Sequence, residues 1–290
     1  MTALKKIILT PNPYRDKNFQ TVRNAMKILQ DAGVEVRLCL PFEVDKTYDL
    51  PSDLRFSRLD KEIQTADMLI CFGGDGTILH MAKTATRNHI PILGVNIGTM
   101  GFMAELESSE LQELSRIATG DYAIEDRMML DVSVYRDRDI IFHDICLNDV
   151  AITKGAAARI VHLNVKCDGV EVMECSGDGM LVATPTGSTA YNLSAGGPIV
   201  EPEANGILIT PICAHDMRSR CVVAAQRRVI TVSLVKNAHR NAYLSVDGGK
   251  AQRLNLGDIA TIRKSQLETK LIRLKDRSFY DVVNTKFKNS

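Results

Sequence analysis

The sequence lacks tryptophan, and aromatic residues make up only 5% of it. Proteins that bind single-stranded nucleic acid stack successive bases on aromatic side chains, so this composition disfavours that class. The formal net charge of +1 provides no strong field for nucleic acid or an anionic membrane. No apolar run approaches the roughly 20 residues of a membrane-spanning helix. The apolar patch near the start is too short for a signal peptide and ends at Pro11 and Pro13. We therefore expect neither nucleic acid nor a membrane as a partner.

The chain also lacks any C-x-x-C pair. Its seven cysteines are scattered, and most lie inside apolar runs. An odd, scattered set argues against a disulfide framework or a thiolate zinc site. Buried thiols of this kind are typical of a reducing compartment, so we expect a cytoplasmic protein.

The first part of the chain alternates short apolar runs with helical periodicity. We expect strands at residues 6–10, 34–40, 67–72 and 91–98, and helices within residues 18–33, 77–85 and 107–118. Strands that alternate with helices predict a parallel sheet. Residues 1–126 are therefore expected to form an α/β domain.

From about residue 120 the apolar residues recur with period two. Turn sequences such as CDGV and DGGK separate these segments, which predicts an antiparallel, sandwich-like β domain over residues 127–273. The amphipathic segment 274–290 is expected to pack back on the first domain. No long linker separates the two domains, and a cleft between domains is the ordinary location of a binding site.

A glycine-rich loop, Gly73-Gly74-Asp75-Gly76-Thr77, follows an apolar strand and opens a predicted helix. Glycine lets the backbone approach a phosphate closely, and a helix N-terminus offers free N–H groups with partial positive charge. The alternative interpretation is a tight turn in which Thr77 or Asp75 caps the helix. The loop is neither G-x-G-x-x-G nor a P-loop, so neither a Rossmann dehydrogenase nor a P-loop enzyme is indicated.

A second run, SGDGMLVATPTGSTAYNLSAGGPIV (176–200), combines hydroxyl side chains with several glycines. Such a segment offers many donors to a polar ligand. Its apolar flanks disfavour an exposed linker, and Ser188 is not in the G-x-S-x-G elbow of a serine hydrolase.

Four segments together resemble the NAD kinase family, in the same order and at similar spacing: GGDGT, GVNIGTMGFMAEL, LNDVAIT and DGMLVATPTGSTAYNLSAGGPI. PICAHDMRSR and SVDGG fall where that family has related segments. The first motif is moderately specific, because lipid kinases and phosphofructokinases have similar loops, whereas the TPTGSTAY run is highly specific. The resemblance covers nearly the whole chain.

The resemblance implies transfer of the ATP γ-phosphoryl group, with Mg²⁺, to the 2′-hydroxyl of the adenosine ribose of NAD, which gives NADP. The family's catalytic aspartate falls on Asp75. Phosphoryl transfer requires mainly positioning and charge stabilisation. An unperturbed aspartate, with a pKa near ~3.9, is a weak base, so we expect Asp75 to act partly by orientation. Gly73, Gly74 and Gly76 would let backbone amides reach the phosphates.

The resemblance also implies a set of NAD-binding residues. They are Gly76, Asn148, Asp149, Asp178, Thr186, Gly187, Ser188, Thr189, Ala190, Tyr191 and Ser194. Tyr191 offers a flat face for an adenine ring, and Asn148 has both a donor and an acceptor. The family commonly forms a homo-oligomer, often a tetramer, so a dimer or tetramer is expected.

Three further candidates have ordinary alternatives. His80 lies where the family often has a polar contact, but a histidine on a helix surface fits equally well. Phe102 is expected to wall the pocket or simply to pack in the core. Arg159 would reach a diphosphate or a neighbouring subunit, although a solvated strand arginine is the favoured interpretation.

The chain departs from the family at three positions. Asp149 replaces the usual glutamate and is one methylene shorter, so its hydrogen bond to a ribose hydroxyl lengthens or passes through water. Cys221 stands where the family often has proline, and Gly249 where it has glutamine. None of these changes touches Asp75.

Two alternative functions stay open from the residues alone. A lipid or sugar kinase uses a similar GGDGT loop, but the 178–199 run argues against it. A non-catalytic sensor of NAD(H) or NADP(H) would keep every glycine-rich loop, and the intact Asp75 disfavours it. The sequence leaves open whether NADH replaces NAD and whether polyphosphate replaces ATP.

Overall fold

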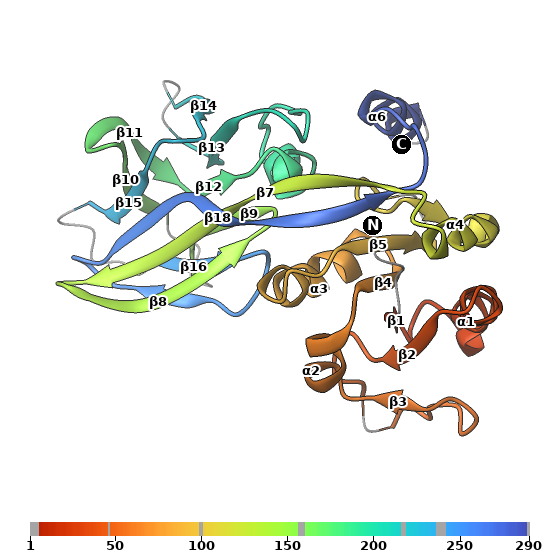
Figure 1. Cartoon of the computed structure of the whole chain (residues 1–290). Coiled ribbons are helices and arrows are strands. Elements are labelled where there is room, and N and C mark those ends of the chain that lie inside the picture. Colours follow the sequence, from red (N-terminus) through yellow and green to blue (C-terminus); the bar gives the residue numbers. More distant parts are fainter. Residues whose placement is uncertain are drawn as a thin grey trace. The chain divides into compact units, whose positions relative to one another are not determined.

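The structure is a computed structural model that describes residues 6–45, 47–98, 101–155, 160–215, 219–235 and 242–288. The chain divides into two compact units, drawn in Figure 1. Unit 1 comprises Met1–Asp126 and Thr269–Ser290, and unit 2 comprises Arg127–Glu268. The chain returns to unit 1 at Thr269 and not at residue 274, because Leu271 already pairs with Ile92 in the sheet of unit 1.

Unit 1 contains a parallel sheet, as the alternating pattern predicts. Its strands are β1 (Lys6–Pro11), β2 (Glu35–Cys39), β3 (Phe56–Ser57), β4 (Met68–Gly73), β5 (Ile92–Asn96) and β6 (Leu106–Glu107). The order is β3-β2-β1-β4-β5, with β6 beside β5, and all these pairs are parallel. Every residue of β4 is buried, as is typical of a parallel strand covered on both faces.

Helices cover both faces of this sheet. Leu93 and Val95 of β5 pack in one hydrophobic cluster with Leu29 of α1 (Gln20–Asp31). Gly94, between them, points to the opposite face, where a Cβ on it would lie 2.4 Å from Cδ1 of Ile78 in α3 (Asp75–Arg87). The helices α1 and α3 therefore lie on opposite faces, as Figure 1 shows.

The strand order creates a point at which ligands bind in open α/β sheets. The chain leaves β1 toward α1 on one face and leaves the adjacent β4 toward α3 on the other. The carboxyl ends of two such strands, here Pro11 and Gly73, border a crevice that no crossover connection covers. The GGDGT loop lies at this position.

The helices differ in part from the prediction. Helix α3 extends beyond the predicted 77–85 at both ends. Residues 107–118 do not form one α-helix but a 3₁₀ segment, η3 (Ser108–Leu114), followed by α4 (Ser115–Ala118). The buried residues Leu111, Leu114 and Ile117 recur every third position, which is the 3₁₀ period, and the capping box of Glu107 and Glu110 starts the segment. The remaining helices of unit 1 are η1 (Lys17–Phe19), α2 (Leu59–Glu62), η2 (Ile63–Thr65) and α6 (Phe279–Lys288).

Unit 2 contains two antiparallel sheets. The first has β7 (Ala123–Arg136), β8 (Asp139–Cys146), β10 (Val161–Cys167), β11 (Val170–Gly177), β15 (Ile230–Leu234) and β18 (Ile259–Arg273). Residues 123–126 of β7 and 269–273 of β18 belong to unit 1. The second has the order β14-β13-β12-β9-β16-β17. Its strands are β9 (Asp149–Lys154), β12 (Gly179–Ala183), β13 (Gly206–Ile212), β14 (Val222–Ala225), β16 (Ala242–Val246) and β17 (Gln252–Leu254).

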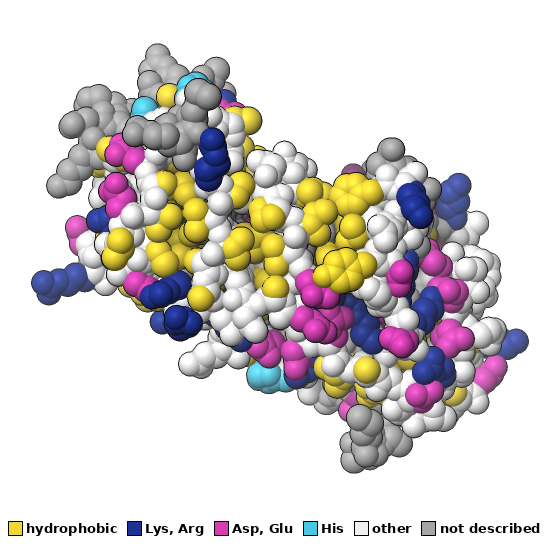
Figure 2. Space-filling model, turned by 90° about the horizontal axis from the view of Figure 1, so that it is seen from above, with side chains coloured by type: hydrophobic (Ala, Val, Ile, Leu, Met, Phe, Trp, Pro, Cys, Tyr) yellow, Lys and Arg dark blue, Asp and Glu magenta, His cyan; other side chains and the backbone are white. Residues whose placement is uncertain are grey.

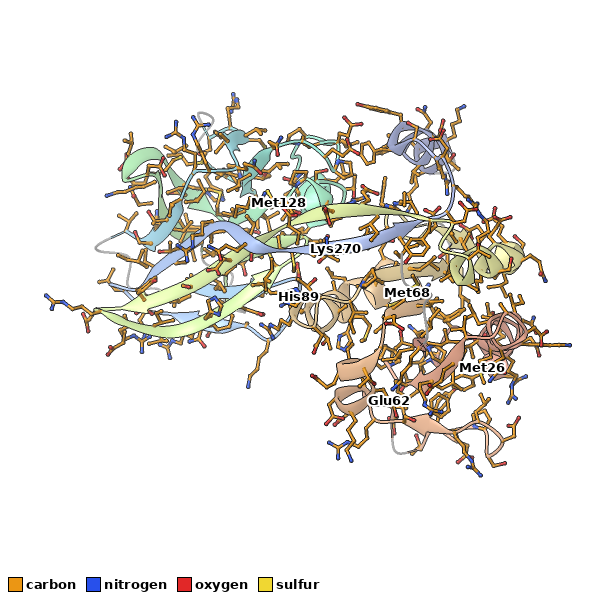
Figure 3. All side chains as sticks on the ribbon, viewed as in Figure 1. Met26, Glu62, Met68, His89, Met128 and Lys270 are labelled. Carbon is orange, nitrogen blue, oxygen red and sulfur yellow. The ribbon has the colours of Figure 1, made fainter. Side chains whose placement is uncertain are left out.

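Side chains from both sheets form one hydrophobic core in unit 2. Val132 of β7, Val182 of β12 and Leu244 of β16 are fully buried in it. The predicted fold class, an α/β domain plus an antiparallel β domain, is confirmed. Met68 and Met128, labelled in Figure 3, belong to the cores of unit 1 and unit 2 respectively.

The surface agrees with the near-neutral composition. On the face drawn in Figure 2, acidic and basic side chains lie interspersed, and hydrophobic side chains are also exposed. None of the helices in the described part of the chain is long and apolar enough to span a membrane.

Candidate active site

The glycine loop of unit 1 is closely packed. A Cβ on Gly73 would lie 2.3 Å from Oγ1 of Thr77, so only glycine fits at the end of β4. The Thr77 hydroxyl accepts a hydrogen bond from Nδ2 of Asn12 at 3.1 Å, which ties the loop to the chain after β1. Gly74 is the extended N-cap of α3 and makes no side-chain cap. The first N–H groups of α3 thus begin at the loop, as a phosphate site requires.

The side chain of Asp75 does not cap its own helix. Its Oδ2 accepts a hydrogen bond from the Phe102 N–H at 2.7 Å, and its Oδ1 accepts one from the Met103 N–H at 3.0 Å. The helix-cap interpretation is therefore wrong for Asp75. A carboxylate offers about four lone-pair sites, so two remain for a hydroxyl or another donor. The two amides fix the direction in which these free lone pairs point.

Gly101 lies directly against this carboxylate. A Cβ built on Gly101 would be 2.0 Å from Oδ1 of Asp75, far inside van der Waals contact. The sequence marks GTMGF as a second glycine-rich turn, but it gives no sign that the turn touches Asp75. The absence of a side chain at residue 101 is what allows Asp75 to reach the two amides.

Phe102 has a packing role through its ring. The ring centroid lies 6.4 Å from that of Phe279 in α6, and Nζ of Lys286 lies 4.8 Å from the Phe102 centroid. The side chain packs against the C-terminal helix, while the backbone N–H binds Asp75.

A buried carboxylate fixes the returning C-terminal segment nearby. Oε1 of Glu105 accepts hydrogen bonds from the N–H groups of Leu274 at 2.8 Å and Lys275 at 2.7 Å. Its Oε2 pairs with Arg273 at 3.1 Å. The segment that supplies the amides for Asp75 is thereby tied to the last strand of unit 1.

A cavity of about 300 Å³ opens beside the loop. Its lining residues are Asn12, Arg15, Phe42, Gly74, Gly76, Thr77 and His80. Nη1 of Arg15 would lie 3.9 Å from a Cβ on Gly74 and 3.2 Å from one on Gly98. The cavity therefore combines a guanidinium group with the N-terminus of α3, both of which favour an anion.

His80 lines this cavity and is exposed, with its ring edge-on to Phe42 at 5.8 Å between centroids. Sequence reasoning missed Asn12, Arg15 and Phe42, which belong to other segments. Only the adjacency of β1 and β4 brings Asn12 and Arg15 to the loop.

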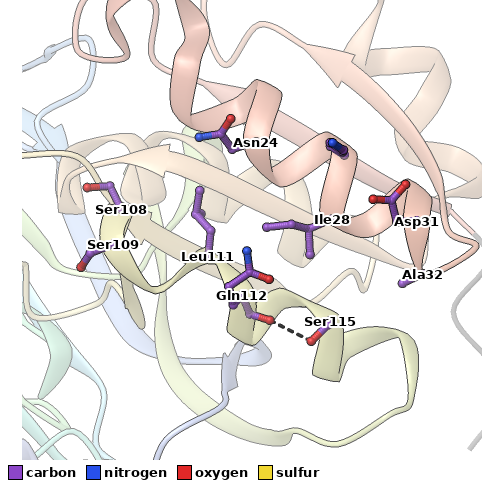
Figure 4. Close-up of a pocket in the computed structure, with 10 residues that line it drawn as sticks. Asn24, Ile28, Asp31, Ala32, Ser108, Ser109, Leu111, Gln112 and Ser115 are labelled. Carbon is purple, nitrogen blue, oxygen red and sulfur yellow. Dashed lines mark hydrogen bonds between the residues drawn. The ribbon is translucent and has the colours of Figure 1, made fainter.

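A larger groove of about 650 Å³ lies elsewhere in unit 1, between α1 and the η3–α4 segment (Figure 4). Ile28 and Leu111 form part of its floor, and the Ser115 hydroxyl donates to the Gln112 carbonyl at 2.8 Å. None of the predicted site residues that the structure describes lines this groove. It has no link to the chemistry of the loop.

In unit 2, Asn148 directly precedes β9 and Asp149 is its first residue; they are 8% and 7% exposed. Oδ1 of Asn148 has no hydrogen-bond partner in the described part of the chain. Burial, and secondarily the negative charge of Asp247, raises the pKa of Asp149 to about 7. Asn148 thus retains a free acceptor, and Asp149 keeps its proton to a higher pH than an exposed aspartate does.

The raised pKa predicts a pH-dependent stability. Below pH 3.8 Asp149 is neutral in both the folded and the unfolded protein. Between pH 3.8 and about 7 it ionises in the unfolded chain but stays protonated in the folded one, so the free energy of unfolding falls as the pH rises through this range. The neutral amide of the variant Asp149→Asn carries no such penalty. The free energy of unfolding of this variant should exceed that of the wild type by on the order of 3 kcal/mol more at pH 8 than at pH 4. Unfolding midpoints at both pH values test this, and an equal difference at the two values would contradict it.

The TPTGS turn packs against the backbone of Asn148. The buried Thr184 hydroxyl donates to the Leu147 carbonyl at 2.5 Å and accepts from the Gly187 N–H at 3.0 Å. A Cβ on Gly187 would lie 2.1 Å from the Asn148 carbonyl oxygen. Two segments that are distant in the sequence, LNDVAIT and TPTGSTAY, therefore form one structural group; Leu147 and Thr184, which bond to each other, are 37 positions apart.

The side chains of Ser188 and Asn192, both buried, stabilise the fold of the 176–200 segment through hydrogen bonds to its backbone. The Ser188 hydroxyl donates to the Val200 carbonyl and accepts from the Val200 N–H, both at 3.0 Å. The Asn192 amide donates to the carbonyl groups of Ser188 and Pro198 at 3.0 Å and accepts from the Thr210 hydroxyl at 2.6 Å. Ser188 is fully buried, so its hydroxyl holds the loop and is not exposed as a nucleophile. Sequence reasoning missed Asn192.

The other predicted residues of the run differ in exposure. Thr186 lies in η4 (Thr186–Thr189) and is buried, with Nη1 of Arg127 donating to its hydroxyl at 3.3 Å. Tyr191 and Ser194, in α5 (Tyr191–Ser194), are exposed, and Thr189 and Ala190 are half-buried.

Asp178 forms an ion pair within unit 2, whereas Arg159 lies outside the described residues. Asp178 is half-exposed and pairs with Nζ of Lys154 at 2.6 Å. Arg159 and residues 216–218 of the PICAHDMRSR segment lie outside the described residues.

Comparison with known proteins decides the family. The family model for the ATP-NAD kinase N-terminal domain matches residues 7–122, and that for the C-terminal domain matches residues 147–274. The chain belongs to the ATP-NAD kinase family. It is an enzyme, a phosphotransferase that uses ATP to phosphorylate NAD to NADP. The lipid or sugar kinase and the non-catalytic sensor are therefore set aside.

Relatives and solved structures agree with this family. The NAD kinase of Ruminiclostridium cellulolyticum is 36% identical over 288 residues, which are 98% of each chain. An NAD kinase from Archaeoglobus fulgidus, solved in complex with ATP, is 26% identical with a TM-score of 0.75 and coverage of 98% of this chain and 99% of that one. Yeast NADH kinase, complexed with NADH, shares the fold at a TM-score of 0.84 and 24% identity, over 98% of this chain and 87% of that one.

Proposed function

We propose that Asp75 is the residue of this ATP-NAD kinase that acts on the 2′-hydroxyl of the adenosine ribose of NAD. The observation that carries the proposal is the carboxylate itself, held by the amides of Phe102 and Met103 with lone pairs left free. It lies at the first turn of α3, beside the cavity that contains Arg15. A fixed acceptor next to a phosphate-binding loop is the arrangement that phosphoryl transfer to a hydroxyl requires.

In this proposal a free lone pair of Asp75 accepts the hydrogen bond of the 2′-hydroxyl and aligns its oxygen with the γ-phosphorus of ATP. The new O–P bond forms as the bond between the γ-phosphorus and the β–γ bridging oxygen breaks, and ADP leaves with that electron pair. The hydroxyl proton passes to Asp75. Because the transition state is loose, the aspartate acts first by orientation and only late as a base.

We propose that NAD binds to the residues that the family resemblance implies in unit 2. Asn148 supports this with its unpartnered buried acceptor, and Thr189, Tyr191 and Ser194 with at least partly exposed side chains. Asp149 and Asp178 would contribute carboxylates. Thr186, Gly187, Ser188 and Ala190 would contribute the shape and backbone groups of the turn. Within unit 1, Gly76 and His80 are proposed to bind substrate beside the glycine loop, where both line the cavity.

Mg²⁺ is proposed to enter as part of the substrate MgATP. Among the described residues, no three His, Cys, Asp or Glu side chains gather into a metal-binding group. In many kinases Mg²⁺ is held by one or two carboxylates together with substrate phosphates. The free lone pairs of Asp75 suit such a single contact, and Gly73, Gly74 and Gly76 would leave room for the phosphates.

Arg15 is expected to bind the phosphates of ATP. The variant Arg15→Gln should raise KM for MgATP about tenfold, because a charge-assisted hydrogen bond contributes roughly 1.5–3 kcal/mol. KM for NAD should change less than twofold. Arg58→Gln is the matched control, since Arg58 is exposed in the same unit and pairs only locally with Asp60 at 2.6 Å. Equal KM values for MgATP in both variants would contradict the role of Arg15.

We also propose a cytoplasmic homo-oligomer, a dimer or tetramer, as the family resemblance implies. All seven cysteines are free thiols, which supports a reducing compartment. Light scattering of the purified protein tests the oligomeric state, and a monomer at assay concentration would refute it.

The function is tested by mixing the purified protein with MgATP and NAD and following NADP with an NADP-specific dehydrogenase. Steady NADP formation is the expected result. NAD binding without NADP formation would contradict the proposed chemistry at Asp75.

A further inference from the structure

We infer that Asp247 is a positioning residue of the NAD site, which holds the backbone that presents Asn148 and Asp149. The inference rests on the proposed role of those two residues in NAD binding. Asp247 lies in the SVDGG segment, whose function the sequence does not reveal. Its carboxylate binds the main-chain N–H groups of Leu147, Asn148 and Asp149, and its negative charge also acts on the carboxyl group of Asp149.

The carboxylate of Asp247 gathers three consecutive main-chain donors. Its Oδ2 accepts from the Leu147 N–H at 3.0 Å, and its Oδ1 accepts from the N–H groups of Asn148 at 2.9 Å and Asp149 at 3.2 Å. The N–H of Asp247 in turn donates to the Asp149 carbonyl at 2.9 Å. Four hydrogen bonds therefore join one residue to one three-residue segment.

The chain geometry at this segment explains the need for an acceptor. Strand β8 ends at Cys146 and β9 begins at Asp149, so Leu147 and Asn148 form the corner between them. Successive N–H groups at such a corner converge into a nest that favours an anion. Without a partner, these buried donors would each lose a hydrogen bond.

Asp247 is placed for this contact by its own strand and turn. Val246, the last residue of β16, pairs with Val150 of β9, so Asp247, which follows it, lies beside the first residue of β9. Asp247 then adopts φ = 51° in a turn that continues through Gly248. Aspartate tolerates this left-handed conformation better than most side chains.

The opposite side of the same segment is also fixed. The Thr184 hydroxyl binds the Leu147 carbonyl, and the Thr184 N–H binds the Asn148 carbonyl at 2.9 Å. Asp247 thus holds the N–H groups while Thr184 holds the carbonyl groups. The side chain of Asn148, with its unpartnered Oδ1, remains to meet a ligand.

The test compares Asp247→Asn with Asp258→Asn in the wild-type background. Asp258 is a matched control: it is buried in the same unit, pairs with Arg136 and accepts the Asn255 N–H, but touches no predicted site residue. In Asp247→Asn, the side-chain NH₂ group is a donor that faces at least one of the three N–H donors of residues 147–149, so at least one hydrogen bond to this segment is lost. We expect KM for NAD to rise about tenfold or more, since hydrogen bonds to charged groups are the stronger ones. KM for MgATP should stay within twofold.

The control should lower the melting temperature without changing KM for NAD. Asp247→Glu keeps both carboxylate oxygens and should recover part of the lost affinity. If Asp247→Asn and Asp258→Asn both lower the melting temperature and neither changes KM for NAD, the inference is wrong.

Hydrogen exchange on the wild-type protein keeps the inference testable if the variants do not fold. The amides of residues 147–149 should exchange slowly, and rapid exchange in the folded protein would overturn the inference. If the wild type makes no NADP, the proposed function fails. Calorimetric NAD binding then replaces KM as the readout for Asp247.

Discussion

Asp75→Asn is expected to lower the turnover number for NADP formation by about 10³-fold, within the range for loss of a general base. Asparagine keeps the size of the side chain but removes its charge. Its NH₂ group would also face the N–H of Phe102 or Met103, where the carboxylate now accepts a hydrogen bond. The residues proposed to bind NAD in unit 2 are unchanged, so the Kd for NAD from calorimetry should stay within a few-fold.

Asp121→Asn is the control for this variant. Asp121 belongs to the same unit and pairs with Arg116 at 2.7 Å on the surface. It should retain wild-type turnover. A turnover number for Asp75→Asn within tenfold of the wild type would show that Asp75 has no chemical role.

Gly101→Ala is expected to have the second largest effect. The new Cβ would lie 2.0 Å from Oδ1 of Asp75, so the carboxylate or the 101–103 backbone has to move. A displacement of about 1 Å at a reacting group lowers the rate on the order of 10²-fold. The turnover number should fall accordingly, with NAD binding largely retained.

Gly206→Ala is the control for Gly101→Ala, because it also adds a Cβ in close contact with a neighbour but does so far along the chain from Asp75. Gly206 opens β13 in unit 2, and a Cβ there would lie 2.9 Å from Cγ1 of Val223, an exposed and movable side chain. That variant should lose a little stability and keep its turnover. Similar turnover in the two variants would mean that Gly101 is not required by Asp75.

The fold was largely predictable because its signals are local. The apolar run 67–72 and the glycines after it predict β4 and the start of α3, and the period-two segments predict the sandwich of unit 2. The helix predicted at 107–118 is present from residue 108, but its division into a 3₁₀ segment and α4 is not predictable, because residues spaced by three suit both an α-helix face and a 3₁₀ segment. The capping box of Glu107 and Glu110 and the non-helical backbone of Glu110 distinguish the two kinds of helix, and both are visible only in the structure.

The sequence predicts which motifs contain the residues of the candidate site, but not which groups contact one another there. The GGDGT loop identified Asp75, but its partners are backbone amides, which leave no mark in the side-chain sequence. Arg15 joins the loop because β1 and β4 are neighbours in the sheet, which no local pattern encodes. Asp247 lies about a hundred residues from the amides it binds, so its role is likewise a property of the fold.

The role of Asp75 in phosphorylating the 2′-hydroxyl of NAD is tested most directly by product analysis. Wild-type protein and Asp75→Asn are incubated with MgATP and NAD at matched NAD occupancy, and the products are separated by chromatography. We predict NADP phosphorylated at the 2′ position from the wild type and almost none from the variant. Equal NADP from both proteins, or phosphate at another position, would contradict it.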